Sequence, residues 1–398
     1  MADSKRDKAA AWIGFILLTT VALIVGRVNH SQLFGTGMFD SFALQADAWR
    51  EGSTHLAEDF KHLELAIYND NYYVSFPPFP SVPIYLLKFI IPSGVPSGLL
   101  TLIYFLLCYP VAYKIARRTI AAASAAMLSF AALAGGSMLD VAVSGTVFAG
   151  AVWYQAQTLS LLLTLCAFYG VGHHRASWRF FGWLSLALAV GCRPFQAVYL
   201  PFLIWEATRR QTELPMGKKL VSILPMWIAP AAVAAALCWY NWIRFGSIFE
   251  FGHNYLPEFM YLHAQFDLKN IAVNFFRILR PPFIEEISSA IPLAYGFAVY
   301  ATNPMLTNAA CSVMRRKPDA GDILLMLTLS AHFFLLLMHP TFGGWQYGTR
   351  YICDLLPGFL ALRYRSGKSV GAPECVYLVS LAAFNIAGTI AFHALSGR

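Results

Sequence analysis

Long apolar stretches alternate with short polar segments along most of the chain. A helix that crosses the hydrocarbon core of a bilayer needs about 20 mostly apolar residues, and stretches of this kind predict about eleven spans. They lie at 9–28, 97–116, 119–138, 153–171, 180–193, 195–208, 221–242, 288–311, 322–338, 352–364 and 371–392. We therefore predict an all-α, polytopic membrane protein whose residues 1–398 form a single transmembrane domain.

Three of these stretches, 180–193, 195–208 and 352–364, are short for a full crossing. The first two meet at Arg193-Pro194. Proline removes a backbone donor and disfavours the helical conformation of the residue before it. This pair is therefore consistent either with two helices or with one broken helix.

The composition supports a membrane environment. Hydrophobic residues make up 58% of the chain and charged residues 13%, whereas a soluble domain carries about 25% charged residues. The first apolar run follows a basic start without a small-x-small cleavage site, so we interpret it as a retained helix and not as a signal peptide. The seven cysteines lie in or beside apolar segments and are interpreted as packing residues.

Basic residues cluster in every second polar connection. These clusters include Lys5, Arg6 and Lys8; Lys114, Arg117 and Arg118; Arg175 and Arg179; Arg209, Arg210, Lys218 and Lys219; Arg315, Arg316 and Lys317; Arg363, Arg365 and Lys368. By the positive-inside rule this face is cytoplasmic, which places the N-terminus in the cytoplasm and the chain in the cytoplasmic (inner) membrane. The formal net charge of +8 forms no continuous basic stripe, which argues against nucleic-acid binding.

Two long loops, 29–79 and 243–287, are predicted on the outer face, where they carry short helices on the membrane surface. In the first loop, Asp40 precedes a potential amphipathic helix from Ser41 to Glu51. Asp40 is interpreted either as the N-cap of that helix or as an acid held at the lipid–water boundary for catalysis. Two apolar-aromatic runs, 64–68 and 72–76, flank an Asn/Asp turn and predict a small hairpin packed over a membrane cavity.

His55, Asp59 and His62 follow one another at i, i+4 and i+7 in the same loop. On a helix they would share one face, as metal ligands do. A solvated polar face explains the same spacing, and both interpretations stay open at this point.

Four arginines lie near helix breaks on the predicted outer side: Arg193, Arg277, Arg280 and Arg350. Charged residues close to the hydrocarbon are costly and often functional, and arginine matches phosphate geometry with paired donors. The alternative is that the side chains extend to lipid headgroups. Arg277 and Arg280 fit that alternative well. Arg193 and Arg350, each among glycine, proline and aromatic residues, fit either.

These features together resemble the GT-C glycosyltransferases, which are multi-spanning enzymes that take a sugar from a polyprenyl-phosphate carrier. Protein O-mannosyltransferases and aminoarabinose transferases belong to that class, and an uncharacterised bacterial branch is more similar still. The residues that carry the resemblance are Asp40; Glu64 to Asn69 and Tyr72 to Pro78; Arg193-Pro194; Arg244 to Gly252; and Gly348 to Pro357.

The resemblance implies transfer of a sugar, of hexosyl or pentosyl type, from a polyprenyl-phosphate donor to a hydroxyl of a glycan, lipid or protein acceptor at the extracytoplasmic face. Asp40 and then Glu64 would be the catalytic carboxylates, while Arg193, Arg350 and Tyr351 would bind the donor phosphate. Secondary candidates are Asp47, His55, Asp59, His62, Arg277 and Arg280. A divalent cation, Mg or Mn, is a further possibility.

The chain departs from the pattern of the class at four positions. Glu64 stands in place of Asp, and Asp70 in place of Gly. Gln155 and Gln157 begin a helix where such proteins can carry Glu and His, which argues against metal ligation from that helix. A transporter or flippase of lipid-linked glycans and a catalytically degenerate membrane scaffold remain as alternatives.

Overall fold

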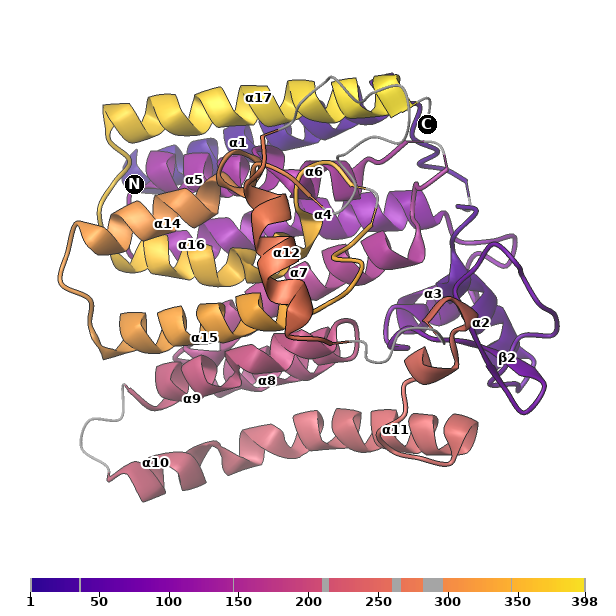
Figure 1. Ribbon diagram of the computed structural model, residues 1–398. Helices are drawn as coiled ribbons and strands as arrows, with labels where there is room; N and C mark the ends of the chain where they lie inside the picture. Colours follow the sequence, from indigo (N-terminus) through magenta and orange to yellow (C-terminus); the bar gives the residue numbers. More distant parts are fainter. Residues whose placement is uncertain are drawn as a thin grey trace.

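The computed structural model describes residues 2–35, 37–145, 147–209, 215–259, 266–281, 296–344 and 346–396. Most helices of this part lie side by side and roughly parallel to one another (Figure 1). They are α1 (Ala2–Val28), α4 (Ser97–Ala116), α5 (Ala122–Ala134), α7 (Val152–Val171), α8 (Ala176–Val190), α9 (Leu200–Thr208), α10 (Met216–Ile223), α11 (Ile228–Phe245), α14 (Pro304–Met314), α15 (Ala320–Leu337), α16 (Leu356–Arg365) and α17 (Ala372–Ser396). The shorter elements are α2 (Ser41–Arg50), α3 (Ser81–Leu87), α6 (Ser137–Ala142), α12 (Lys269–Leu279), α13 (Val299–Thr302) and the 3-10 turns η1 (Pro194–Tyr199), η2 (Leu224–Trp227), η3 (His253–Tyr255), η4 (Pro257–Phe259) and η5 (Arg350–Leu355).

Five of the described helical stretches are long and apolar enough to cross a membrane. They are Lys5–Val28, Ser97–Ala116, Gly217–Phe245, Ala320–Leu337 and Ala372–Ala394. The prediction of an all-α, multi-pass membrane protein is confirmed. The predicted number of about eleven spans is not confirmed.

One break divides a stretch that the hydropathy pattern predicts as a single span, and a second separates two stretches that it predicts as neighbours. The predicted span 119–138 separates into α5 and α6 at Gly135-Gly136, where Gly136 takes an extended conformation. The stretches 180–193 and 195–208 become two helices, α8 and α9, with η1 between them. The predicted span 288–311 is described from residue 296 onwards, where it forms α13 and α14. Its first part, 288–295, lies outside the described residues. The same is true of 260–265 and 282–287 in the predicted second outer loop.

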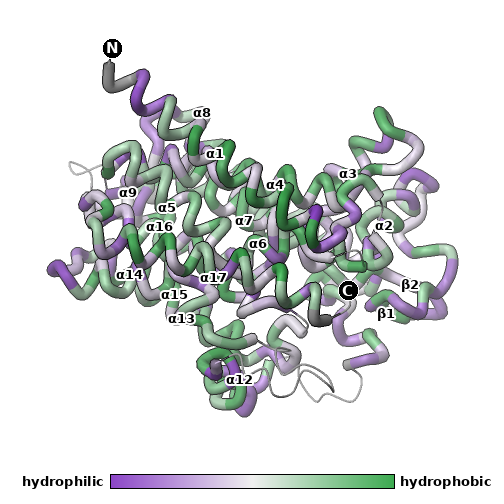
Figure 2. The backbone as a smooth tube through the Cα atoms, turned by 90° about the horizontal axis from the view of Figure 1, so that it is seen from above, coloured by the Kyte–Doolittle hydropathy of each residue, from purple (hydrophilic) through white to green (hydrophobic). Residues whose placement is uncertain are grey.

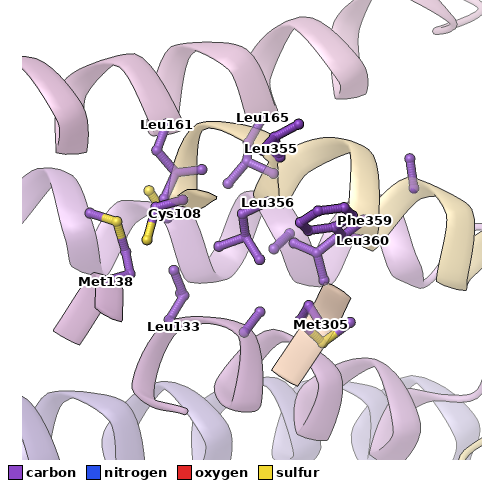
Figure 3. Packing of buried hydrophobic residues seen from close by; sticks show 14 of the residues in the cluster. Cys108, Leu133, Met138, Leu161, Leu165, Met305, Leu355, Leu356, Phe359 and Leu360 are labelled. Atoms are coloured by element: carbon purple, nitrogen blue, oxygen red, sulfur yellow. The ribbon is translucent and has the colours of Figure 1, made fainter. Parts of the chain in front are cut away.

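The core forms around α16, which is too short to be a span and is buried along almost its whole length. Leu356, Phe359 and Leu360 of this helix pack between α7 and α5 (Figure 3). Cys108 of α4 and Met305 of α14 belong to the same cluster. A helix in this position exchanges lipid contact for contact with other helices, so its length is not set by the thickness of the bilayer.

The predicted hairpin is confirmed. Strands β1 (Leu65–Tyr68) and β2 (Asn71–Val74) pair antiparallel, with Leu65 opposite Val74 and Tyr68 opposite Asn71. Asn69 and Asp70 form the turn with φ of 50° and 58°. Positive φ at both central residues is the requirement of a type I′ turn, whose twist matches that of the strands.

The two ends of the helix bundle differ. The hairpin, α2 and α3 gather at one end, and the N-terminus and the α14–α15 and α16–α17 connections lie at the other (Figure 1). Figure 2 shows hydrophobic residues along most of the helices and hydrophilic stretches concentrated towards the ends. The separation of the hairpin from the basic connections agrees with the predicted distribution of charge. That the basic end is cytoplasmic remains a prediction.

Glycines allow α7 and α8 to approach closely. A Cβ atom on Gly182 would lie 2.5 Å from the backbone nitrogen of Val171 and 2.8 Å from the carbonyl carbon of Gly170. Small residues at helix crossings in membrane proteins permit this contact between backbones. Because the opposing atoms belong to the backbone, a side chain at position 182 forces the helices apart.

We therefore expect Gly182→Ala to destabilise the fold by about 1–3 kcal/mol, the usual cost of overpacking. Melting in detergent, followed by intrinsic fluorescence, measures the effect. Gly217→Ala is the matched control, since nothing lies within 4 Å of its added Cβ and alanine favours a helix over glycine by up to about 1 kcal/mol. Equal melting temperatures for the two variants would contradict the close approach.

Candidate active site

A cavity of about 330 Å³ lies where the segment after β2 meets α7, η1, the end of α15 and η5. It is lined by Phe76, Pro77, Trp153, Ala156, Cys192, Arg193, Pro194, Phe195, Phe251, His253, Phe266, Leu336, His339, Arg350, Tyr351 and Asp354. The structure therefore brings Arg193 together with the adjacent pair Arg350 and Tyr351. The resemblance implied one role for all three residues, binding of the donor phosphate.

Arg193 sits at the break between α8 and η1, where Pro194 begins the 3-10 turn. Its Nε donates to Oδ2 of Asp354 at 2.6 Å, and its guanidinium carbon lies 5.1 Å from the ring centre of Tyr351. These contacts fix the side chain inside the protein. Extension to lipid headgroups, one of the two interpretations of this residue, is wrong.

Arg350 is the first residue of η5 and is 4% exposed. Its Nη2 donates to the carbonyl oxygen of Gly343 at 3.0 Å, and its guanidinium carbon lies 4.9 Å from the ring centre of Tyr351. Gly343 has a φ of 96°, a backbone conformation open mainly to glycine. The glycine-rich turn thus supplies the carbonyl that orients the arginine, and this side chain also does not extend to lipid.

Two glutamines at the start of α7 connect the parts of the site. Nε2 of Gln157 donates to the carbonyl oxygen of Arg350 at 2.7 Å and to Oδ1 of Asp354 at 3.0 Å. Nε2 of Gln155 donates to Oδ1 of Asp40 at 2.7 Å and to the carbonyl oxygen of Gly150 at 2.6 Å. The residues that depart from the GT-C pattern are therefore buried hydrogen-bond donors within the site.

Asp40 caps α2, as one interpretation of the sequence predicted. The backbone nitrogen of Ala43 donates to its Oδ1 at 3.1 Å. Its Oδ2 lies near Ser97 but makes no hydrogen bond of normal geometry within the described part of the chain. Burial raises the pKa of the Asp40 carboxyl to about 6. Neither Asp40 nor its partner Gln155 lines the cavity, although Ala156, the residue after Gln155, does.

Glu64 reaches the cavity wall through a tryptophan. Nε1 of Trp153, a lining residue, donates to Oε2 of Glu64 at 3.2 Å. Burial raises the pKa of the Glu64 carboxyl, while the positive charge of Arg350 opposes that rise. Glu64 thus lies within electrostatic range of Arg350.

The sequence alone did not single out two histidines of the cavity, His253 and His339. Burial lowers the pKa of His253. Burial also lowers the pKa of His339 to about 3, and the neighbouring His253 and the positive charges of Arg193 and Arg350 add to that effect. Both are therefore neutral at pH 7. Asp354 lies in the stretch from Gly348 to Pro357 that carries the resemblance, but the sequence assigned no role to it. The one available signal for His339 was its position directly after an apolar helix and before a proline.

The secondary candidates lie elsewhere. Asp47 of α2 pairs with Lys88. Arg277 donates to Asn274 Oδ1 at 3.2 Å within α12, and Arg280 caps the end of that helix. None of these three residues lines the cavity.

The interpretation of His55, Asp59 and His62 as one face of a helix is wrong. α2 ends at Arg50, and Gly52 turns the chain with a φ of 79°. Leu56 then pairs with Tyr72 beside the hairpin, which holds this segment out of a helix. Across the described residues, no three His, Cys, Asp or Glu side chains gather as metal ligands.

No protein-family model and no curated protein sequence matches the chain. Solved structures do. ArnT from Cupriavidus metallidurans, both without ligand and bound to undecaprenyl phosphate, aligns with a TM-score of 0.53 and 14% identity over 90% of this chain and 60% of ArnT. The oligosaccharyltransferase from Archaeoglobus fulgidus aligns with a TM-score of 0.55 and 12% identity over 97% of this chain and 56% of that protein.

The chain has the GT-C fold. It spans about 60% of the length of ArnT. The GT-C fold confirms the class of architecture that the resemblance implied, a mostly helical membrane domain. At this level of identity the likeness concerns the fold, and the roles of individual residues rest on the geometry above.

The buried carboxyl of Asp40 predicts a pH-dependent stability. With a folded pKa of about 6 and a reference pKa of 3.8, the folded protein keeps a proton that the unfolded chain releases between these values. Stability is therefore lost as the pH rises from about 4 to 6, by about 2–3 kcal/mol in all. Asp40→Asn removes this loss, so its melting temperature should exceed that of the wild type increasingly over this range and by a constant margin above pH 6. A margin that does not change with pH would refute the assignment.

Proposed function

We propose that this protein transfers a sugar from a polyprenyl-phosphate donor to an acceptor hydroxyl at the extracytoplasmic face of the inner membrane, with its N-terminus in the cytoplasm. The observation that carries the proposal is the convergence of Arg193 and Arg350 on Tyr351 at the wall of one cavity. The GT-C fold supports it, since one aligned ArnT structure binds undecaprenyl phosphate.

The donor phosphate is proposed to bind at the two guanidinium groups. Asp354 neutralises one of them, and the two cavity histidines are uncharged, so the lining residues keep an excess of one positive charge. Guanidinium groups present paired donors that match phosphate oxygens. Because they are already oriented by Asp354 and Gly343, they can stabilise the charge that develops on the leaving phosphate without reorganisation.

Asp40 is proposed as the general base, with Glu64 as the second candidate. The acceptor oxygen forms a bond to the anomeric carbon while the bond from that carbon to the phosphate oxygen breaks. The hydroxyl proton passes to Asp40, and the electron pair leaves with the polyprenyl phosphate. A pKa of about 6 suits a base that works near neutral pH, and its buried Oδ2 has no hydrogen bond among the described residues.

A divalent cation, Mg or Mn, does not fit the residues around Asp40. Hard cations take several oxygen ligands, mainly carboxylates, carbonyls and water. The neighbour of Asp40 is instead the amide of Gln155, whose nitrogen donates to the carboxylate. No step of the proposed reaction is therefore assigned to a metal.

The phosphate role predicts that Arg350→Lys loses at least about tenfold in transfer, because lysine keeps the charge but not the paired donors. Turnover of a radiolabelled polyprenyl-phosphate sugar in proteoliposomes measures it. Arg277→Lys, the same change outside the cavity, is the matched control and should remain active. An Arg350→Lys enzyme with full activity would rule out the phosphate role.

Amide variants distinguish the proposed roles of the Asp40 and Glu64 carboxylates. Removing a general base typically costs about 10²–10⁴-fold in rate, so Asp40→Asn should lose transfer on this scale while Glu64→Gln keeps most of it. Melting temperatures of both variants establish that they fold. The reverse order of activities would make Glu64 the base and Asp40 only the cap of α2.

A further inference from the structure

A second cavity lies at the other end of the bundle, away from the candidate active site. It has a volume of about 490 Å³ and opens between the last turns of α14, the α16–α17 connection and the first turn of α17 (Figure 1 shows these elements). Its lining residues are Thr307, Asn308, Cys311, Ser312, Arg315, Arg363, Ser366, Lys368, Ser369, Gly371, Pro373, Glu374 and Tyr377.

The charges in this cavity are unbalanced. It holds three cations, Arg315, Arg363 and Lys368, and one carboxylate, Glu374. Arg363 donates to both oxygens of that carboxylate, from Nε to Oε1 at 2.7 Å and from Nη2 to Oε2 at 2.9 Å. Arg315 and Lys368 form no ion pair within the part of the chain that the structure describes, so their charges are available to an anion.

The inner wall carries polar atoms without partners. Asn308 is 7% exposed. Its Nδ2 donates to Glu374 at 2.8 Å, but its Oδ1 has no hydrogen bond among the described residues. The buried hydroxyl of Ser312 has none there either. Buried polar groups are normally paired. An amide oxygen accepts and a hydroxyl can donate, so these two atoms fit a polar ligand that carries both a hydroxyl group and an acceptor oxygen.

The backbone adds to the positive character. Gly371 and Pro373 line the cavity at the start of α17, a helix of 25 residues. The N-terminus of a helix carries partial positive charge from its unpaired N–H groups. Together with the two unpaired cations and the partnerless hydroxyl, this arrangement fits a phosphate group.

We propose that this cavity binds the phosphate of an anionic phospholipid headgroup. Basic pockets between membrane helices on the cytoplasmic side are suited to such headgroups, and α14 and α17 lie at the basic end of the bundle. The position favours a lipid over a soluble phosphate compound, because α17 is a candidate membrane span beside the cavity. The inference is independent of the transfer reaction at the opposite end.

The test compares Arg315→Gln/Lys368→Gln with the control pair Arg175→Gln/Lys218→Gln. All four side chains are exposed, and each pair removes one arginine and one lysine, but the control pair lies outside the cavity. Binding of phosphatidylglycerol and phosphatidylcholine to the detergent-solubilised full chain is measured by native mass spectrometry. We expect the cavity variant to bind phosphatidylglycerol about 25-fold more weakly, since each basic residue contributes about a fivefold gain, and the control to bind as the wild type does.

Ser369→Glu provides a second variant that keeps both cations. Ser369 is exposed and lines the cavity, so the added carboxylate should repel phosphate and weaken phosphatidylglycerol binding without changing the melting temperature. Unchanged lipid binding in both cavity variants, or an equal loss in the control pair, overturns the proposal.

A further experiment distinguishes a phospholipid from a soluble phosphate compound as the ligand of the cavity. Inorganic phosphate is added to the wild type and to Arg315→Gln/Lys368→Gln at matched ionic strength, and the melting temperatures are compared. A lipid site predicts a preference for phosphatidylglycerol over phosphatidylcholine that the cavity variant loses. No such preference, combined with stabilisation of the wild type alone by inorganic phosphate, overturns the lipid assignment in favour of a soluble phosphate compound.

Discussion

The carboxylate of Asp354 imposes the strongest constraint on this structure. It is 3% exposed and lies among apolar helices, where an ionised group is tolerated only when it is paired. Arg193 approaches from the α8–η1 break, and Gln157 approaches from α7. Satisfying this one charge therefore fixes three separate chain segments against one another, and Arg350, four residues earlier on η5, is positioned by the same arrangement.

This constraint also explains why helices break where they do. Pro194 cannot donate a backbone hydrogen bond, so it ends the regular helix at Arg193. The turn at η1 leaves Arg193 beside Asp354, and η5 replaces one helical turn with a 3-10 segment before α16. The short helix α16 can then be buried, because the polar groups at its start already have partners. Irregular backbone at this depth is acceptable in a membrane protein where it lines a cavity inside the protein.

Local signals in the sequence were sufficient for some features and not for others. The cap at Asp40 and the turn at Asn69 and Asp70 depend on neighbouring residues, and both were predicted. The number of spans was not, because Gly135-Gly136 lies within an apolar run of the sequence, while the extended conformation of Gly136 and its close approach to the carbonyl oxygen of Thr302 exist only in the folded chain. His253 and His339 were missed for a related reason, since only the folded chain brings them beside Arg193 and Arg350. The helical interpretation of His55, Asp59 and His62 failed because pairing of Leu56 with Tyr72, sixteen residues further on, determines that segment.

The two glutamines of α7 give the departures from the GT-C pattern a physical meaning. A second carboxylate beside Asp40 would repel it, and two such charges in a buried place require a cation. An amide instead donates a hydrogen bond and adds no charge, so Gln155 favours the ionised form of Asp40 and opposes the effect of burial. Gln157 donates in the same way to the carboxylate of Asp354. The first turns of α7 thus supply a neutral donor to each acid, and Arg193 adds a charged partner for Asp354, while both arginines line the cavity.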